Sequence, residues 1–114
     1  MKVRVFKLEG CVFCQELVKL LKKEKIPFTS VEVTDPNNRD QVNKLEQFFE
    51  NSSYPKVILE IGYSKTVFIN PRTGTVPDLT DLGDSYFEYY NSIDDISNII
   101  KKHKINKNEI QTFG

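Results

Sequence analysis

The residues of this 114-residue chain whose types and spacing best suit chemistry are two cysteines, Cys11 and Cys14. The sequence has no other cysteine and only one histidine, His103. A secreted scaffold of this size would carry several disulfides that join distant segments. One close pair in an otherwise cysteine-free chain indicates either thiol redox chemistry or half of a metal site such as a zinc knuckle.

The position of the pair favours redox chemistry. Apolar residues predict a strand over 2–8, and the apolar period becomes helical from Cys11 onward. At the start of a helix Cys11 meets unpaired N–H groups and the positive end of the helix dipole, which lower the pKa of such cysteines to roughly 3.5–7.5. Cys14 lies one turn later, on the apolar stripe that includes Leu17 and Leu21. We therefore assign Cys11 as the nucleophile and Cys14 as the cysteine that resolves a mixed disulfide.

The remaining pattern predicts one α/β domain over 1–105 and a flexible tail over 106–114. A helix from Cys11 is ended by Pro27, and the segment 70–91 shows no clear period. The other predicted elements are a strand at 28–33, a helix at 38–51, a hairpin of 56–61 with 65–69, and a helix at 92–104. Strand, helix and strand in the first 33 residues indicate a βαβ unit with parallel strands.

Composition excludes several classes of protein. Sixteen basic and sixteen acidic residues give zero formal net charge, so there is no electrostatic footprint for nucleic acid or an anionic membrane. No apolar run reaches the ~20 residues that span a bilayer. Charges at Lys2, Arg4 and Lys7 interrupt the apolar stretch that a signal peptide needs. We expect a soluble, cytoplasmic monomer.

The order of these elements resembles a glutaredoxin of the thioredoxin superfamily. The resemblance rests on Cys-Val-Phe-Cys at the first helix, on Tyr54-Pro55 opening a hairpin, and on the closing helix. Val-Phe between the cysteines is similar to the small dithiol glutaredoxins of large bacteriophages. The resemblance implies a thioredoxin-like fold, with a central four-stranded mixed sheet flanked by about three helices. The segment at about 70–90 is extra to that pattern.

The resemblance also implies a cis-proline that faces the two cysteines. Pro55 matches by its place between a helix and a strand, and Tyr54 would offer its backbone to glutathione or a peptide. Thr75-Val76-Pro77 carries the letters common in the family, but it follows the hairpin instead of preceding it. A trans proline that merely opens a strand is the structural alternative for Pro55.

The positions that bind glutathione in the family are matched only in part by this sequence. Phe13 would line the glutathione groove by apolar contact. Leu8 occupies the position of the family's usual cation, which leaves Lys7 as the nearest positive charge. Asp94 and Asp95 retain the family's two acidic residues but lack its paired glycines, and they could meet the γ-glutamyl ammonium. Acidic residues in a first helical turn also suit a capping box, which is the structural alternative.

The implied activity is thiol–disulfide oxidoreduction on protein or glutathione mixed disulfides, through a dithiol–disulfide cycle of Cys11 and Cys14. Glutathione as co-substrate, or a thioredoxin reductase, would supply the electrons. The client would be a disulfide-containing protein, and the bacteriophage resemblance suggests ribonucleotide reductase and the host cytoplasm. The alternative is a thioredoxin-like binding module whose CxxC is structural or binds zinc or an iron–sulfur cluster. No further ligands for a metal are predicted.

Overall fold

In the computed structural model, residues 1–46, 53–62, 65–72 and 85–113 are described. Five strands form one sheet in the order β2-β1-β3-β4-β5. Their bounds are β1 Lys2–Lys7, β2 Thr29–Glu32, β3 Lys56–Ile61, β4 Lys65–Pro71 and β5 Ser85–Tyr90. The pairs β1–β2 and β4–β5 are parallel, whereas β1–β3 and β3–β4 are antiparallel. The predicted α/β architecture with a mixed, thioredoxin-like sheet is confirmed.

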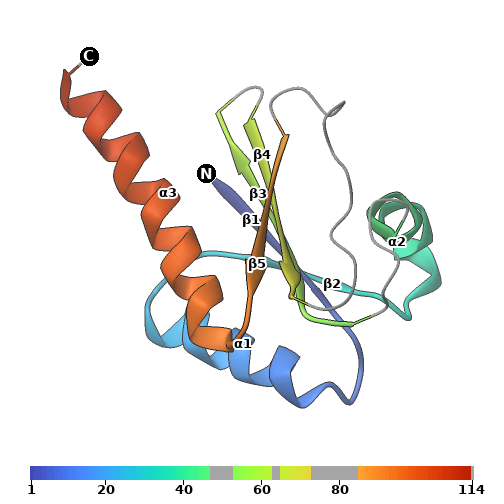
Figure 1. Cartoon of the computed structure of the whole chain (residues 1–114). Coiled ribbons are helices and arrows are strands. Elements are labelled where there is room, and N and C mark those ends of the chain that lie inside the picture. Colours follow the sequence, from blue (N-terminus) through green and yellow to red (C-terminus); the bar gives the residue numbers. More distant parts are fainter. Residues whose placement is uncertain (47–52, 63–64, 73–84, 114) are drawn as a thin grey trace.

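Helices cover both faces of this sheet (Figure 1). Helices α1 (Val12–Lys23) and α3 (Ile93–Phe113) lie on one face. The 3-10 helix η1 (Pro36–Asn38) leads into α2 (Arg39–Glu46), which lies on the other. No helix in the described part of the chain is long and apolar enough to cross a membrane.

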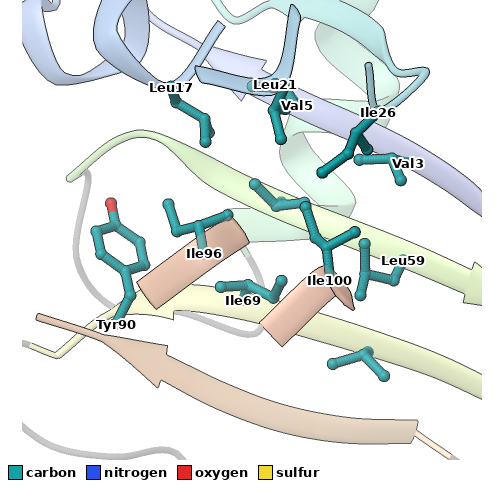
Figure 2. Close-up of a cluster of buried hydrophobic side chains, with 12 residues drawn as sticks. Val3, Val5, Leu17, Leu21, Ile26, Leu59, Ile69, Tyr90, Ile96 and Ile100 are labelled. Atoms are coloured by element: carbon teal, nitrogen blue, oxygen red, sulfur yellow. The ribbon is translucent and has the colours of Figure 1, made fainter. Parts of the chain in front are cut away.

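The face under α1 and α3 carries the larger core, here called the α1/α3 cluster (Figure 2). Its buried members are Val3, Val5, Leu17, Leu21, Ile26, Val57, Leu59, Val67, Ile69, Tyr90, Ile96 and Ile100. Alternation along the strands sends Val57 and Leu59 to this face, and the helical period places Ile96 and Ile100 one turn apart above them. Apart from the Tyr90 hydroxyl, this core consists of aliphatic and aromatic surface.

The opposite face carries a smaller core, the α2 cluster. Its buried members are Phe6, Cys14, Val31, Val42, Leu45, Tyr54 and Ile58. Phe68 of β4 and Phe87 of β5 extend it as a stacked pair, with ring centroids 4.9 Å apart. One of the two cysteines thus belongs to this second core.

Two expectations from the sequence need correction. The sheet has a fifth strand, β5, that the sequence left as part of an unexplained segment. In Ser85–Tyr90 aromatic residues occupy both faces, so the strand lacks the alternation by which strands are recognised. The last helix was predicted to end at 104, whereas α3 runs to Phe113, and no glycine or proline interrupts the chain between Ile93 and Phe113.

Charged side chains form ion pairs between strand β5 and helix α3. Glu88 of β5 pairs with Lys102 and accepts from His103 Nε2 at 3.1 Å. These partners lower the pKa of the Glu88 carboxyl against the opposing effect of its burial. Glu24 after α1 binds Ser97 and Lys101 of α3 in a similar way. The last helix is therefore fixed to both α1 and the added strand.

Candidate redox site at the start of α1

The two cysteines lie where β1 gives way to α1. Gly10 has φ +81°, a conformation that glycine adopts without strain, and it turns the chain from the strand into the helix. Cys11 and Cys14 form a disulfide with Cα atoms 5.2 Å apart. Cys11 is the N-cap residue, and its Sγ accepts from the backbone N–H of Cys14 at 3.1 Å. An anionic sulfur at Cys11 would be stabilised by that N–H and by the helix dipole.

The two sulfurs have different surroundings. The side chain of Cys14 is 1% exposed and belongs to the α2 cluster, whereas Cys11 is only partly buried. Between them, Val12 and Phe13 are 63% and 61% exposed. A substrate disulfide can therefore reach Cys11 from solvent, with an apolar surface beside it, while Cys14 lies behind it in the core.

The proline loop lies against this pair. The Tyr54–Pro55 peptide bond is cis, as the sequence predicted, and the Tyr54 carbonyl oxygen is 3.7 Å from Cys11 Sγ. Pro55 itself is buried and directly precedes β3, which pairs with β1. The alternative at Thr75-Val76-Pro77 lies outside the described residues.

Sequence reasoning missed a polar group that supports Tyr54 on the α2 face. The Tyr54 hydroxyl donates to Glu46 Oε1 at 2.9 Å, and Lys56 Nζ is 4.5 Å from the centre of the Tyr54 ring. Lys56 is fully buried, and this burial lowers the pKa of its ammonium to about 8 although Glu46 acts in the opposite direction. Burial and the bond to Glu46 raise the pKa of Tyr54, which stays a neutral donor.

A second residue that the sequence did not single out for the site approaches from β5. The buried Tyr90 hydroxyl donates to the Pro55 carbonyl oxygen at 2.7 Å. Among the aromatic residues of 86–90, Tyr90 and Phe87 join the cores, while Tyr86 is 50% exposed. The only signal in the sequence was the presence of Tyr90 at the end of an aromatic run.

Three of the residues expected to contact glutathione, Phe13, Asp94 and Lys7, line two hollows beside α1. One, of about 580 Å³, is lined by Phe13 together with Asn91, Ser92 and Asp94 at the start of α3. The other, of about 410 Å³, is lined by Lys7, Leu8 and Cys14. The structure thus brings Phe13 and Asp94 together and places Lys7 in a separate hollow with the buried cysteine.

Asp95 has a different setting from Asp94. Its Oδ2 accepts from the backbone N–H groups of Asn91 at 2.8 Å and Ser92 at 3.1 Å, and these bonds lower the pKa of its carboxyl. The capping role offered as the structural alternative therefore accounts for this residue. Of the two acidic residues carried over from the family, Asp94 lines the Phe13 hollow, to which Glu16 of α1 also contributes.

The metal alternative has no additional ligands in the described segments. Within them, no group of three or more His, Cys, Asp or Glu side chains is placed to hold an ion. His103 instead pairs with Glu88, as described above.

Comparison with known proteins identified one family. The sequence profile of the glutaredoxin family matches residues 3–60, slightly more than half of the chain. The match includes both cysteines and the cis-proline, and it ends before β4 begins. Comparison with curated proteins and with solved structures gave no match.

Proposed function

Because the chain belongs to the glutaredoxin family, we propose that it reduces protein or glutathione mixed disulfides through a Cys11/Cys14 dithiol–disulfide cycle. The observation that carries the proposal is the position of the partly exposed Cys11 at the N-cap of α1, with its Sγ 3.1 Å from the backbone nitrogen of Cys14. This placement favours the thiolate, which is the reactive form of a cysteine.

The cycle begins with the reduced pair. The Cys11 thiolate attacks one sulfur of the substrate disulfide, a new bond forms to Cys11, and the other substrate sulfur leaves as a thiolate that takes up a proton. Cys14 then loses its proton and attacks Cys11 Sγ, which releases the second substrate thiol and leaves the Cys11–Cys14 disulfide. Two electrons pass from the protein to the substrate. The short distance between the cysteine Cα atoms lets resolution proceed without large backbone movement.

The backbone of Tyr54 is the proposed docking point for the substrate chain beside the reacting sulfur. Its carbonyl is 3.7 Å from Cys11 Sγ, within reach of an N–H group on a residue flanking the substrate cysteine. The exposed Phe13, two residues after Cys11, would add apolar contact to the substrate.

Glutathione is the proposed co-substrate. Its γ-glutamyl ammonium would meet Asp94 in the Phe13 hollow, and Lys7 is the cation proposed for a carboxylate. Because Leu8 replaces the usual cation, we propose that glutathione binds weakly and that a thioredoxin reductase shares the reduction. A disulfide-bearing client such as ribonucleotide reductase, in the cytoplasm of a bacteriophage host, fits the resemblance noted in the sequence.

The experiment that tests this proposal measures disulfide exchange by the protein itself, without any reducing partner. Reduced protein, freed of reductant, is mixed with a fluorescent peptide carried as a glutathione mixed disulfide, and release of the peptide thiol is followed. We expect stoichiometric release by the native protein and none by Cys11→Ser. The matched control Ser30→Ala changes an exposed residue of β2, leaves both cysteines in place and should release the peptide normally. Undiminished release by Cys11→Ser, or none by the native protein, would refute the proposal.

A further inference from the structure

Tyr90 lies on a strand that the glutaredoxin profile does not reach, yet its side chain contacts the proline loop. The profile match ends at residue 60, whereas β5 begins at Ser85. Strand β5 runs parallel to β4, so its last residue, Tyr90, pairs with Pro71 at the same end of the sheet as Pro55. In Figure 2 the Tyr90 ring rises from the end of β5 with its hydroxyl toward the start of β3.

The contact has the features of a specific hydrogen bond. The Tyr90 hydroxyl donates to the Pro55 carbonyl oxygen at 2.7 Å, and the Tyr90 side chain is 8% exposed. Burial raises the pKa of this phenol, so the hydroxyl keeps its proton and remains a donor. A buried carbonyl that loses its partner costs more than an exposed one, because no water replaces the bond.

We propose that Tyr90 is a positioning residue for the disulfide exchange, acting through Pro55 on the backbone that receives the substrate. The inference rests on the proposed function. Holding the Pro55 carbonyl restrains the adjoining peptide unit, whose carbonyl, that of Tyr54, is 3.7 Å from Cys11 Sγ. A docking strand that is already in place loses less conformational freedom when the substrate binds. The added strand thus supplies a support for the substrate-binding loop from outside the matched region.

The discriminating variant is Tyr90→Phe, which removes the hydroxyl and keeps the ring. Tyr89→Phe is its matched control, because the buried Tyr89 hydroxyl has no hydrogen-bond partner within the described residues. Each reduced protein is mixed with increasing concentrations of the glutathionylated fluorescent peptide. The half-saturating concentration and the limiting rate of peptide release are then measured, along with the thermal midpoint of each variant.

We expect Tyr90→Phe to raise the half-saturating concentration about fivefold to tenfold, while the limiting rate stays within about twofold. The 13C carbonyl resonance of Pro55 should shift in Tyr90→Phe, and both readouts should be nearly unchanged in Tyr89→Phe. A lower thermal midpoint with an unaltered half-saturating concentration would overturn the positioning role. Native protein that fails to release the peptide would instead refute the proposed function on which this role depends.

Discussion

The cores on the two faces of the sheet bury different kinds of side chain. The α1/α3 cluster joins two helices to four strands through side chains that are all aliphatic except Tyr90, whose buried hydroxyl is hydrogen-bonded. The α2 face is smaller and includes Cys14, the Tyr54 ring and the fully buried Lys56. Burying a charge opposes folding, whereas burying aliphatic surface favours it. The contrast indicates that the first face supplies stability and that the second holds the groups around the reacting sulfur.

Truncating the aliphatic face should give the largest loss of stability. Ile100→Ala removes a fully buried side chain above β3 and β4, and we expect the free energy of unfolding to fall by about 2–5 kcal/mol. Peptide release by the folded fraction should remain within about twofold of the native rate. Urea denaturation measures the first effect and single-turnover release the second. A strong loss of activity at full folding would contradict the division between the faces.

Removing the buried charge from the α2 face should raise the stability of the protein instead of lowering it. Lys56→Met keeps the length of the side chain but removes an ammonium whose pKa burial lowers to about 8. We expect the free energy of unfolding at pH 7 to rise by about 1–3 kcal/mol. Urea denaturation of the oxidised protein is the measurement, because the disulfide prevents the cysteines from titrating. A clear loss of stability would show that Lys56 is needed structurally.

The burial of Lys56 also predicts that the free energy of unfolding depends on pH. The unfolded chain keeps its lysine protonated to about 10.5, so between pH 8 and 10 it binds more protons than the folded protein. The free energy of unfolding of the native protein should therefore rise with pH across this window. In Lys56→Met this rise should be absent. Above pH 10 the raised pKa values of Tyr54 and Tyr90 act in the opposite direction and favour unfolding. A flat profile from pH 8 to 10 in the native protein would contradict the buried charge.

Tyr54→Phe tests the polar support with a smaller change. It removes the hydroxyl that bonds Glu46 and leaves the ring and the backbone carbonyl beside Cys11. We expect about 1 kcal/mol less stability and a rise of about twofold to threefold in the half-saturating peptide concentration. Glu46→Gln, which keeps an acceptor for the hydroxyl, should lose less than Tyr54→Phe. An unchanged Tyr54→Phe beside a destabilised Glu46→Gln would show that the charge of Glu46, and not the hydrogen bond, carries the effect.

The smallest effect concerns the rim of the site, where Leu8 is 38% exposed. Leu8→Lys restores a cation for a glutathione carboxylate, and because the position is solvent-accessible we expect the half-saturating glutathione concentration to fall only about threefold. Steady-state reduction of the mixed disulfide at varied glutathione concentration measures it. Leu8→Gln, of similar length without charge, is the control. Native protein that saturates at low glutathione, with no gain from the lysine, would refute weak glutathione binding.

The sequence predicted those parts of the molecule that local chemistry determines. The change of period at Cys11 was sufficient to predict the junction that holds the two cysteines, and the family resemblance added the cis bond before Pro55. A capping box was the structural alternative for Asp95, and its carboxylate does accept from the Ser92 N–H.

Contacts between segments that are distant in the chain could not be predicted from the sequence in the same way. Lys56 follows Pro55 like any residue at the start of a strand, and nothing local shows that β3 buries it completely. The role of Tyr90 depends on β5 pairing in parallel with β4, after a connection whose length hides the relation between the two strands. In both residues the effect arises from packing between segments far apart in the chain.

The most direct test of the central claim is to trap the first covalent intermediate. Cys14→Ser and Cys11→Ser, each reduced and then exposed to oxidised glutathione, are analysed by intact-protein and peptide mass spectrometry. The N-cap position of Cys11 and the burial of Cys14 predict one stable glutathione adduct on Cys11 in the first variant and none in the second. A stable adduct on Cys14, with none on Cys11, would reverse the assignment of nucleophile and resolving cysteine.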